Sequence, residues 1–218
     1  MGLGIAQVTG ILELYNLGYL KNKSNILDIG SQELHLRKND LKNLCNQTDM
    51  DSSEIDSYPD IDMYPSKPRC SSKYLWKSLG IENYSSIDIN EEHGSLKHDL
   101  NLPFEKKDYF NKFDIVTDIG SCEHVFNIPE AYRTVHKITK PGGLIIIHQA
   151  KIGGNGYYQF DRFFFESLAA ANNYKVVISN YTIILNEKTK EGSNKQFRIP
   201  LSQDFLNIIN KENVKNIG

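Results

Sequence analysis

The stretch that decides the fold is NILDIGSQELHL, residues 25–36. It opens with an apolar run over residues 26–29 that carries Asp28 in its interior and ends at Gly30. A carboxylate left unpaired away from water is costly, so a strand of this composition needs hydrogen-bond donors around Asp28. We therefore expect a buried strand at 26–29 whose carboxyl end lies in polar surroundings.

Strand and helix patterns alternate along the rest of the chain. Helical spacing of apolar residues predicts an amphipathic helix within 3–20. Three further helices are predicted: a short one in SKYLWKSLGI (72–81), one from Asn127 to the KPGG turn and one around Phe160–Ala171. Strands are predicted at 85–90, 94–99, 113–120, 144–149 and 174–185, the last with KQFRIPL (195–201) as a possible partner. Alternating strands and helices favour an open α/β sheet with right-handed crossovers.

Composition narrows the class of protein. The chain has 218 residues and a net charge of −2, which fits one domain and argues against a general nucleic-acid binder. Its three cysteines include no CxxC pair, so neither a disulfide framework nor a zinc site is indicated. No apolar run approaches the roughly 18 residues of a membrane span, and the first residues lack a signal-peptide pattern. We therefore expect a cytoplasmic protein with no membrane span.

Residues 39–73 differ from the rest of the chain. The segment 49–68 holds six acids, four serines and three prolines. This composition predicts an acidic inserted loop that is mobile without ligands. We expect it to lie over the part of a ligand-binding cleft that receives the acceptor substrate, rather than in the core. Tyr58 and Tyr64 are expected to be its contacts with the rest of the protein. The alternative is a solvated loop without a function.

Acidic residues fall at or just beyond the ends of the predicted strands, namely Asp28, Asp88, Asp99, Asp118 and Glu123. Ligands of open α/β sheets bind outside the carboxyl ends of the strands. Neither a G-x-G-x-x-G pattern nor a P-loop lysine is present, and an acid beside the first loop would repel phosphate. A cofactor with a cationic end and a ribose diol, such as S-adenosylmethionine, fits this acidic edge better.

The same segments resemble the motifs of class I S-adenosylmethionine-dependent methyltransferases. The matching stretches are ILDIGSQ (26–32), SSIDIN (85–90), KHDLN (97–101), FDIVTDIGSCEHV (113–125) and KPGGLIII (140–147), in the family's order. Two features depart from the family: the glycine-rich loop is reduced to DIGSQ, and the distance from Asp28 to Asp88 exceeds the usual ~20 residues because of the insertion.

The resemblance implies a fold, a cofactor and a set of residues that bind it. The fold is a Rossmann-like, seven-stranded, mostly parallel sheet with helices on both faces and an antiparallel final strand, spanning residues 1–218 as a single domain. S-adenosyl-L-methionine would be the cofactor and S-adenosyl-L-homocysteine the product. Asp28 would take the cofactor's ammonium, directly or through water, Asp88 both ribose hydroxyls and Asp99 the adenine amine. The remaining implied cofactor residues are Gly30, Ser31, Gln32, Ile89, Leu100, Ile119 and Gly120.

The acceptor side is expected just past the fourth and fifth strands of the motif series. Glu123, His124 and His148 are candidates for removing a proton, and histidine suits this role because its pKa of about 6.5 lies near neutral pH. Either histidine could instead be structural. Tyr157 and Tyr158 are candidates for the wall of the methyl site. Lys151 and Arg162 could hold an anionic acceptor, or be ordinary surface charges.

Several alternatives stay open at this point. No ligand spacing supports a metal site among the histidines, so none is expected. The acceptor is expected to be a small molecule, through O-methylation of a sugar or of an acidic or phosphorylated metabolite, as in bacterial methyltransferases of surface-polysaccharide or secondary-metabolite pathways. A homodimer is also allowed. The rivals are a non-catalytic binding or scaffold protein of the same fold and a nicotinamide-dependent oxidoreductase.

Overall fold

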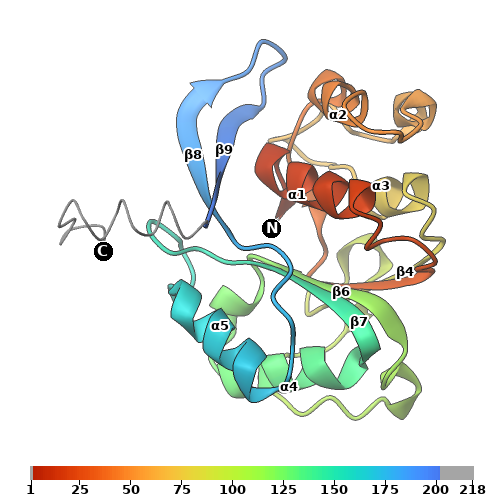
Figure 1. Cartoon of the computed structure of the whole chain (residues 1–218). Coiled ribbons are helices and arrows are strands. Elements are labelled where there is room, and N and C mark those ends of the chain that lie inside the picture. Colours follow the sequence, from red (N-terminus) through yellow and green to blue (C-terminus); the bar gives the residue numbers. More distant parts are fainter. Residues whose placement is uncertain (1, 202–218) are drawn as a thin grey trace, which may run out of the picture.

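A parallel sheet of five strands forms the centre of the computed structural model, which describes residues 2–201 (Figure 1). The strands in spatial order are β5 (Leu96–Lys97), β4 (Asn83–Asp88), β2 (Asn25–Ile29), β6 (Phe113–Ile119) and β7 (Thr139–His148). All neighbouring pairs are parallel. Numbered along the chain, this order is 3-2-1-4-5, that of a doubly wound sheet. The predicted Rossmann-like α/β fold is therefore confirmed.

Helices cover both faces of this sheet, as expected (Figure 1). One face carries α1 (Ile5–Asn16), α2 (Lys38–Cys45) and α3 (Lys73–Ser78), and the other carries α4 (Ile128–Ile138) and α5 (Arg162–Ala171). Successive side chains of a strand point to opposite faces. Accordingly Ile26 packs in the cluster under α1 and α3, whereas Leu27 packs in the cluster with α4.

The chain leaves β2 through a tight turn rather than through a helix. Gly30 has a φ of +86°, a left-handed conformation that suits glycine. The chain then forms the short strand β3 (Glu33–Leu34), which pairs in parallel with β1 (Gly2–Leu3). Four short 3₁₀ turns complete the connections: η1 (Ser53–Ser57), η2 (Glu92–Gly94), η3 (Lys107–Tyr109) and η4 (Cys122–His124).

The acidic insertion is part of the core, so the expectation that it lies outside the core is wrong. Its buried residues Leu41, Cys45, Met50, Ile55, Tyr58 and Ile61 belong to the same cluster as the sheet residues under α1. The physical reason is spacing: the apolar side chains are separated by acids, which remain on the solvent side. The two tyrosine contacts are confirmed. The Tyr58 hydroxyl donates to the Tyr74 carbonyl at 2.9 Å, and the Tyr64 ring stacks on His35 with centroids 4.4 Å apart.

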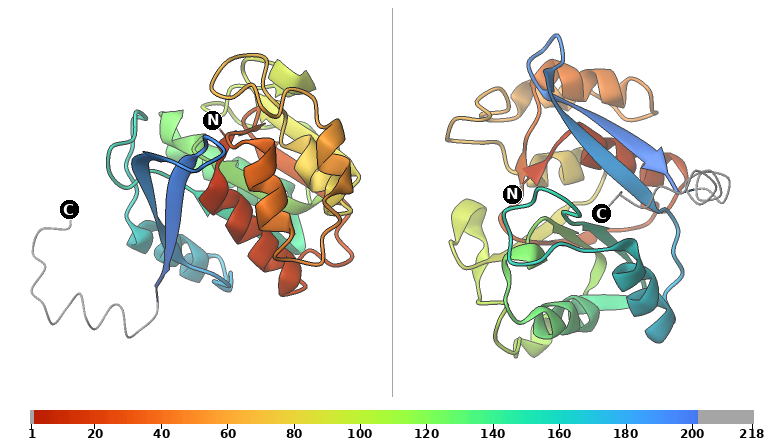
Figure 2. Two further views of the ribbon diagram at one scale, coloured as in Figure 1. Left: turned by 90° about the horizontal axis from the view of Figure 1, so that it is seen from above. Right: turned by 90° about the vertical axis from the view of Figure 1, so that its left-hand side faces the viewer.

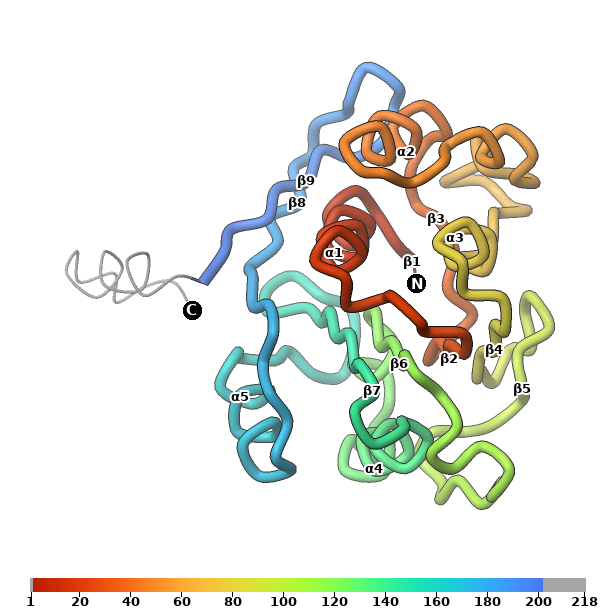
Figure 3. Tube along the Cα trace, turned by 45° about the vertical axis from the view of Figure 1, so that its right-hand side comes forward, coloured from red at the N-terminus to blue at the C-terminus, as the bar shows by residue number. Residues whose placement is uncertain are grey.

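The C-terminal strands do not join the central sheet, which corrects the expected strand count of seven. β8 (Asn180–Lys188) pairs with β9 (Asn194–Pro200) in a separate antiparallel hairpin. Figures 2 and 3 show this hairpin beside α1 and α2. Contacts with α1 hold it there: the Gln196 side-chain oxygen accepts from the Ala6 amide at 2.8 Å, and Arg198 pairs with Glu13. Within residues 2–201, β7 is consequently an edge strand of the sheet.

Among the described residues, no helix combines the length and apolar character needed to cross a membrane.

Candidate cofactor and acceptor site

Asp28 is enclosed beneath the carboxyl end of the sheet. Its carboxylate is fully buried and accepts hydrogen bonds from the hydroxyls of Ser72, Thr117 and Tyr84, the last at 3.0 Å. Burial raises the pKa of Asp28, and these three donors oppose the rise. The donors that the sequence requires are thus present, but they are internal. Both carboxylate oxygens of Asp28 already accept hydrogen bonds, so the expected direct contact with a cofactor ammonium would require one of these hydroxyls to move.

Asp88, at the end of β4, lies where a ligand can reach it. One carboxylate oxygen accepts from the Ser31 amide at 2.7 Å and the other from the Asn90 amide at 3.1 Å. These bonds tie the turn after β2 to the loop after β4. A carboxylate has about four lone-pair positions, so two remain for further donors. The neighbouring Ile89 side chain is 59% exposed and offers an apolar surface beside the carboxylate.

Ser31 and Gln32 are buried, and their side chains are used differently. The Ser31 hydroxyl contacts the Asn90 side chain at 2.9 Å and Ser95 at 2.8 Å, which fixes the loop after β4. The Gln32 amide nitrogen donates to the carbonyls of Ile29 and Ile119, bridging the ends of β2 and β6. The Gln32 amide oxygen is buried and, among the described residues, has no hydrogen-bond partner.

The Asp99 loop lies beyond the short strand β5. One oxygen of Asp99 accepts from both the backbone and side-chain nitrogens of Asn101, at 2.9 and 2.7 Å. The backbone hydrogen bond from Asn101 lowers the pKa of Asp99. Leu100 is buried and packs in the cluster with α4, so it supports the loop from below.

The turn after β6 is held by Asp118. This fully buried carboxylate accepts from the amides of Cys122 and Ser121 at 3.0 and 3.3 Å and from the Tyr132 hydroxyl at 3.0 Å. Like Asp28, it is a structural acid rather than a ligand of the cleft, and its burial raises its pKa. The Ile119 carbonyl faces Gln32, and the Gly120 amide donates to the His148 carbonyl at 2.8 Å.

Glu123 and His124 are adjacent and oriented toward each other. The Glu123 side chain is only 8% exposed and accepts from the Ala150 amide at 2.8 Å. The imidazole of His124 lies with Nε2 3.6 Å from the Glu123 carboxylate and is 38% exposed. The pair therefore combines a fixed carboxylate with an accessible histidine, which is the arrangement expected of a proton acceptor and its orienting group.

Tyr157 and Tyr158 pack against the 123–126 turn. The Tyr157 amide donates to the Glu123 carbonyl at 2.7 Å, and the Tyr158 hydroxyl donates to the Phe126 carbonyl at 2.7 Å. Gly156 permits this approach, because a Cβ there would lie 2.5 Å from the Glu123 carbonyl oxygen. The Tyr157 ring is 72% exposed and meets Phe126 edge-on, with centroids 6.3 Å apart.

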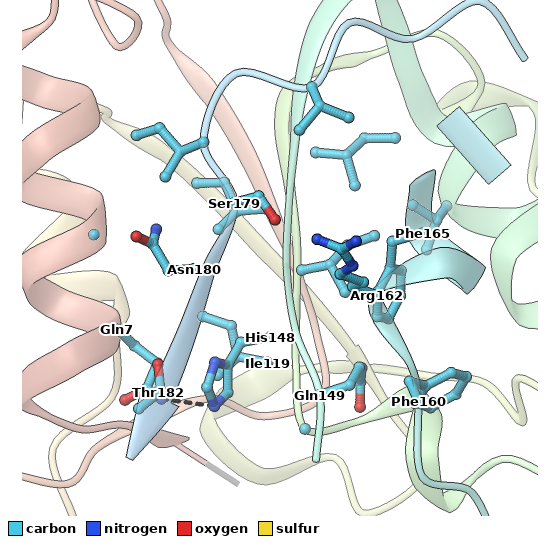
Figure 4. A pocket seen from close by; sticks show the side chains of 18 of the residues that line it. Gln7, Ile119, His148, Gln149, Phe160, Arg162, Phe165, Ser179, Asn180 and Thr182 are labelled. Carbon is cyan, nitrogen blue, oxygen red and sulfur yellow. Dashed lines mark hydrogen bonds between the residues drawn. The ribbon is translucent and has the colours of Figure 1, made fainter. Parts of the chain in front are cut away.

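A crevice of about 2600 Å³ runs along the free edge of β7, between this strand and residues 174–184. The acceptor candidates Glu123, His124, His148, Lys151 and Arg162 line it, together with Ile119 and Gly120. Figure 4 shows that the lining side chains leave β7 in two directions. His148 points toward α1 and β8, whereas Gln149 points toward Phe160 and Arg162 on the α5 side.

The two basic residues are not equivalent. The Lys151 ammonium pairs with Asp161 at 3.0 Å, and this hydrogen bond raises the pKa of Lys151. The Arg162 guanidinium instead lies over the Phe163 ring, 4.7 Å from its centroid. The expected single basic pocket is therefore divided, with Arg162 on the far side of β7 from His148.

One contact escapes the sequence patterns altogether. Gln7, in the first turn of α1, has its side-chain nitrogen 2.8 Å from His148 Nε2. The two residues are 141 positions apart in the sequence. The helical periodicity of α1 indicates only that Gln7 lies near the boundary between the apolar and polar faces of the helix. No local signal identifies such a pair.

The chain matches no protein-family model and no curated protein. Among solved structures it is similar to the YcgJ protein of Bacillus subtilis, with 12% identity, a TM-score of 0.41 and coverage of 89% of this chain and 95% of that one. The methyltransferase domain of bacterial CtHen1 shows 15% identity, a TM-score of 0.41 and coverage of 90% and 96%. The CurJ carbon methyltransferase shows 9% identity, a TM-score of 0.43 and coverage of 91% and 55%. These values are too low to carry a functional argument, and the fold assignment rests on the strand order.

Proposed function

We propose that the protein is an S-adenosylmethionine-dependent methyltransferase that methylates a hydroxyl oxygen of a small acidic sugar or phosphorylated metabolite. The observation that carries this proposal is the position of Asp88. A partly exposed carboxylate ends the second strand of a 3-2-1-4-5 sheet, is tied to the turn after the first strand, and is followed by the exposed Ile89. A carboxylate matches a vicinal diol, and an adjacent apolar side chain suits a flat base.

The described residues fit the cofactor at a second point. The amide nitrogen of Gln32 bridges the ends of β2 and β6, and its buried oxygen has no hydrogen-bond partner among the described residues. A buried acceptor without a donor is costly, and an ammonium group supplies donors. We therefore assign to Gln32 the ammonium contact that the sequence pattern gives to Asp28. When S-adenosylmethionine is bound, it supplies the electrophilic methyl group for transfer to the substrate. Asp99 and Leu100 remain the proposed adenine contacts.

The acceptor is proposed to bind in the crevice beside β7, with His124 as the base. Displacement on a sulfonium carbon requires an aligned nucleophile, exclusion of water and removal of the hydroxyl proton. The Glu123 carboxylate lies 3.6 Å from Nε2 of His124, on the buried side of the pair. Tyr157 packs against the turn that carries Glu123 and His124, and its ring would form an aromatic wall of the methyl site.

Replacing the proposed base tests this assignment. We expect His124→Ala to lower kcat by ~10²-fold or more, the usual scale for a lost general base, with the cofactor Kd unchanged. The neighbouring exposed Phe126→Leu is the matched control, because it alters the same turn without removing a titratable group. Full activity in His124→Ala would remove His124 from the base role.

An anionic acceptor is proposed because Arg162 lies in the crevice, and a guanidinium can bind a carboxylate or phosphate through two hydrogen bonds. Lys151 is already paired with Asp161, so its contribution is expected to be smaller. The expected result is a KM for the acceptor raised at least tenfold by Arg162→Ala and less by Lys151→Ala. If neither variant changes KM, the acceptor is neutral.

A second candidate function is a non-catalytic protein that uses this fold for binding. The observation that favours it is the loop after β2, which keeps a single glycine, Gly30, and in which Gln32 and Leu34 are fully buried. The two candidates differ in one measurement, the transfer of labelled methyl from the cofactor to a mixture of small hydroxylated acids and sugar phosphates. Transfer identifies an enzyme, and cofactor binding without transfer identifies the second candidate.

A further inference from the structure

His148 and Gln7 form a pair whose hydrogen-bond polarity can be worked out atom by atom. His148 ends β7 and points toward the amino-terminal turn of α1, where the Gln7 side-chain nitrogen lies 2.8 Å from its Nε2 (Figure 4). The other end of the Gln7 amide is also fixed. Its oxygen accepts from the Gly4 amide at 3.0 Å, as part of the cap of α1.

The Gly4 contact decides the orientation of the Gln7 side chain. A backbone N–H can only donate, so the Gln7 atom that faces Gly4 must be the oxygen. The atom that faces His148 is therefore the NH₂ group, which can only donate. Nε2 of His148 accepts this hydrogen bond and carries no proton. A neutral imidazole has one N–H, which is then on Nδ1.

The surroundings of the ring favour the neutral form. Burial lowers the pKa of His148, and the amino-terminal end of α1 carries a partial positive charge that disfavours an imidazolium. Figure 4 places Gln7 of α1, Ile119 of β6 and Thr182 of β8 around the ring, and none of these side chains titrates. Within residues 2–201, no hydrogen bond is made by Nδ1, and the residue lines the crevice.

We propose that Gln7 is a positioning residue that holds His148 as a neutral imidazole and presents its Nδ1–H to an oxygen of the acceptor in the crevice. His148 then binds the acceptor as a hydrogen-bond donor and does not remove its proton, because it has no free lone pair. This assignment of a substrate-binding role rests on the proposed methyltransferase function, whereas the tautomer and its dependence on Gln7 do not.

The tautomer can be measured without cofactor or acceptor. In protein labelled with ¹⁵N-histidine, two-bond ¹H–¹⁵N correlation spectra separate protonated from unprotonated ring nitrogens. We expect His148 at pH 7 to be the neutral Nδ1–H tautomer and to take up a second proton at a lower pH than a free histidine. An Nε2–H tautomer, or an imidazolium at pH 7, in the unaltered protein would overturn the proposal.

The dependence on Gln7 is tested by Gln7→Glu, with Gln47→Glu as the control for the added charge at an exposed position. A carboxylate can only accept, so Gln7→Glu should move the proton to Nε2 and raise the pKa of His148 by at least about one pH unit. Gln47→Glu should leave both unchanged. An unchanged tautomer and titration in folded Gln7→Glu would overturn the role of Gln7.

A kinetic measurement tests the binding role separately. With the true acceptor, Gln7→Leu should raise KM at least fivefold and change kcat less than twofold, because the donor is misoriented while the base is untouched. A fall in kcat alone would overturn the donor role. If no methyl transfer is found but the spectra show the expected tautomer, the proposed function fails while the Gln7–His148 assignment stands.

Discussion

At the scale of single residues, Asp28 joins three segments that are distant in the sequence. Its buried carboxylate receives hydroxyls from the start of α3, from β4 and from β6. Removing an acceptor that serves three buried donors leaves those donors unsatisfied. Asp28 is therefore a residue of stability, although it lies in the motif that resembles a cofactor-binding loop.

We expect Asp28→Ala to lower the free energy of unfolding by about 3 kcal/mol or more, because three hydroxyls lose their partner. Asp28→Asn keeps one acceptor oxygen, and hydroxyl protons can rotate, so its cost should be about half as large. Urea unfolding at pH 7 measures both. The cofactor Kd of the folded variants should match the unaltered protein. A stable Asp28→Ala that binds cofactor poorly would restore the original cofactor role.

His35 makes stability depend on pH. Burial lowers its pKa to about 4, and its ring stacks on Tyr64. The unfolded chain takes up the proton near pH 6.5 and the folded chain only near 4, so the free energy of unfolding should fall as the pH drops from 6.5 toward 4. The limit is about 3 kcal/mol.

His35→Phe keeps a stacking ring and removes the titration. Its unfolding free energy should therefore vary less between pH 6.5 and 5 than that of the unaltered protein. Chemical unfolding at several pH values provides the comparison. Equal slopes in the two proteins would show that His35 is protonated in the folded state.

Sequence patterns locate acids at strand ends but not their partners. The need for donors around Asp28 follows from its neighbours in the strand, whereas the identity of Ser72, Thr117 and Tyr84 depends on how three crossovers pack. Asp88 and Asp28 look alike as strand-end acids, yet one is accessible and the other enclosed. The register puts both side chains on the same face of the sheet, but Asp28 is paired with Ser86 and Asp88 lies two residues further along, at the end of β4. Local composition does not encode this difference in position.

At the scale of elements, residues 39–73 show how an acidic composition can conceal a core contribution. Ile55 is fully buried within the short turn η1 and packs in the cluster under α1. Acids on either side of it mask this contribution in any average over the segment. The insertion is consequently a structural cap on one face of the sheet.

We expect Ile55→Ala to lower the free energy of unfolding by about 2–4 kcal/mol, the cost of a cavity in a packed core. Ser53→Ala, at an exposed position of the same turn, should change it by less than about 0.5 kcal/mol. Both are measured by denaturant unfolding. Similar small effects in the two variants would mean that the insertion does not contribute to the core.

The β8–β9 hairpin departs from the predicted sheet for a comparable reason. The sequence predicts a strand within 174–185 with 195–201 as a possible partner, and β8 and β9 do pair, but it does not predict that the pair leaves the central sheet. Gln196 and Arg198 of β9 form hydrogen bonds with α1, and these contacts place the hairpin beside α1 rather than beside β7. These are polar contacts between residues nearly two hundred positions apart, which strand periodicity cannot reveal.

At the scale of the whole molecule, the parallel sheet brings the carboxyl ends of β2, β4 and β6 together. The proposed cofactor site lies at these carboxyl ends, and the proposed acceptor crevice lies along the edge strand β7. The order of motifs along residues 25–150 is sufficient to predict the first. For the second, the sequence predicts the lining residues that follow β6 and β7, whereas the wall formed by residues 174–184 depends on where the hairpin packs and could not be predicted.

The central claim is that Asp88 and Gln32 hold S-adenosylmethionine or its product. Calorimetric titration with S-adenosylhomocysteine tests it most directly, with Asp88→Ala and Gln32→Leu beside the unaltered protein and Glu91→Ala as an exposed acid-removal control in the same loop. We expect micromolar binding that Asp88→Ala weakens by about 2–4 kcal/mol, with a smaller loss in Gln32→Leu and none in Glu91→Ala. No heat of binding to the unaltered protein at millimolar ligand, or equal affinity in Asp88→Ala, would contradict the claim.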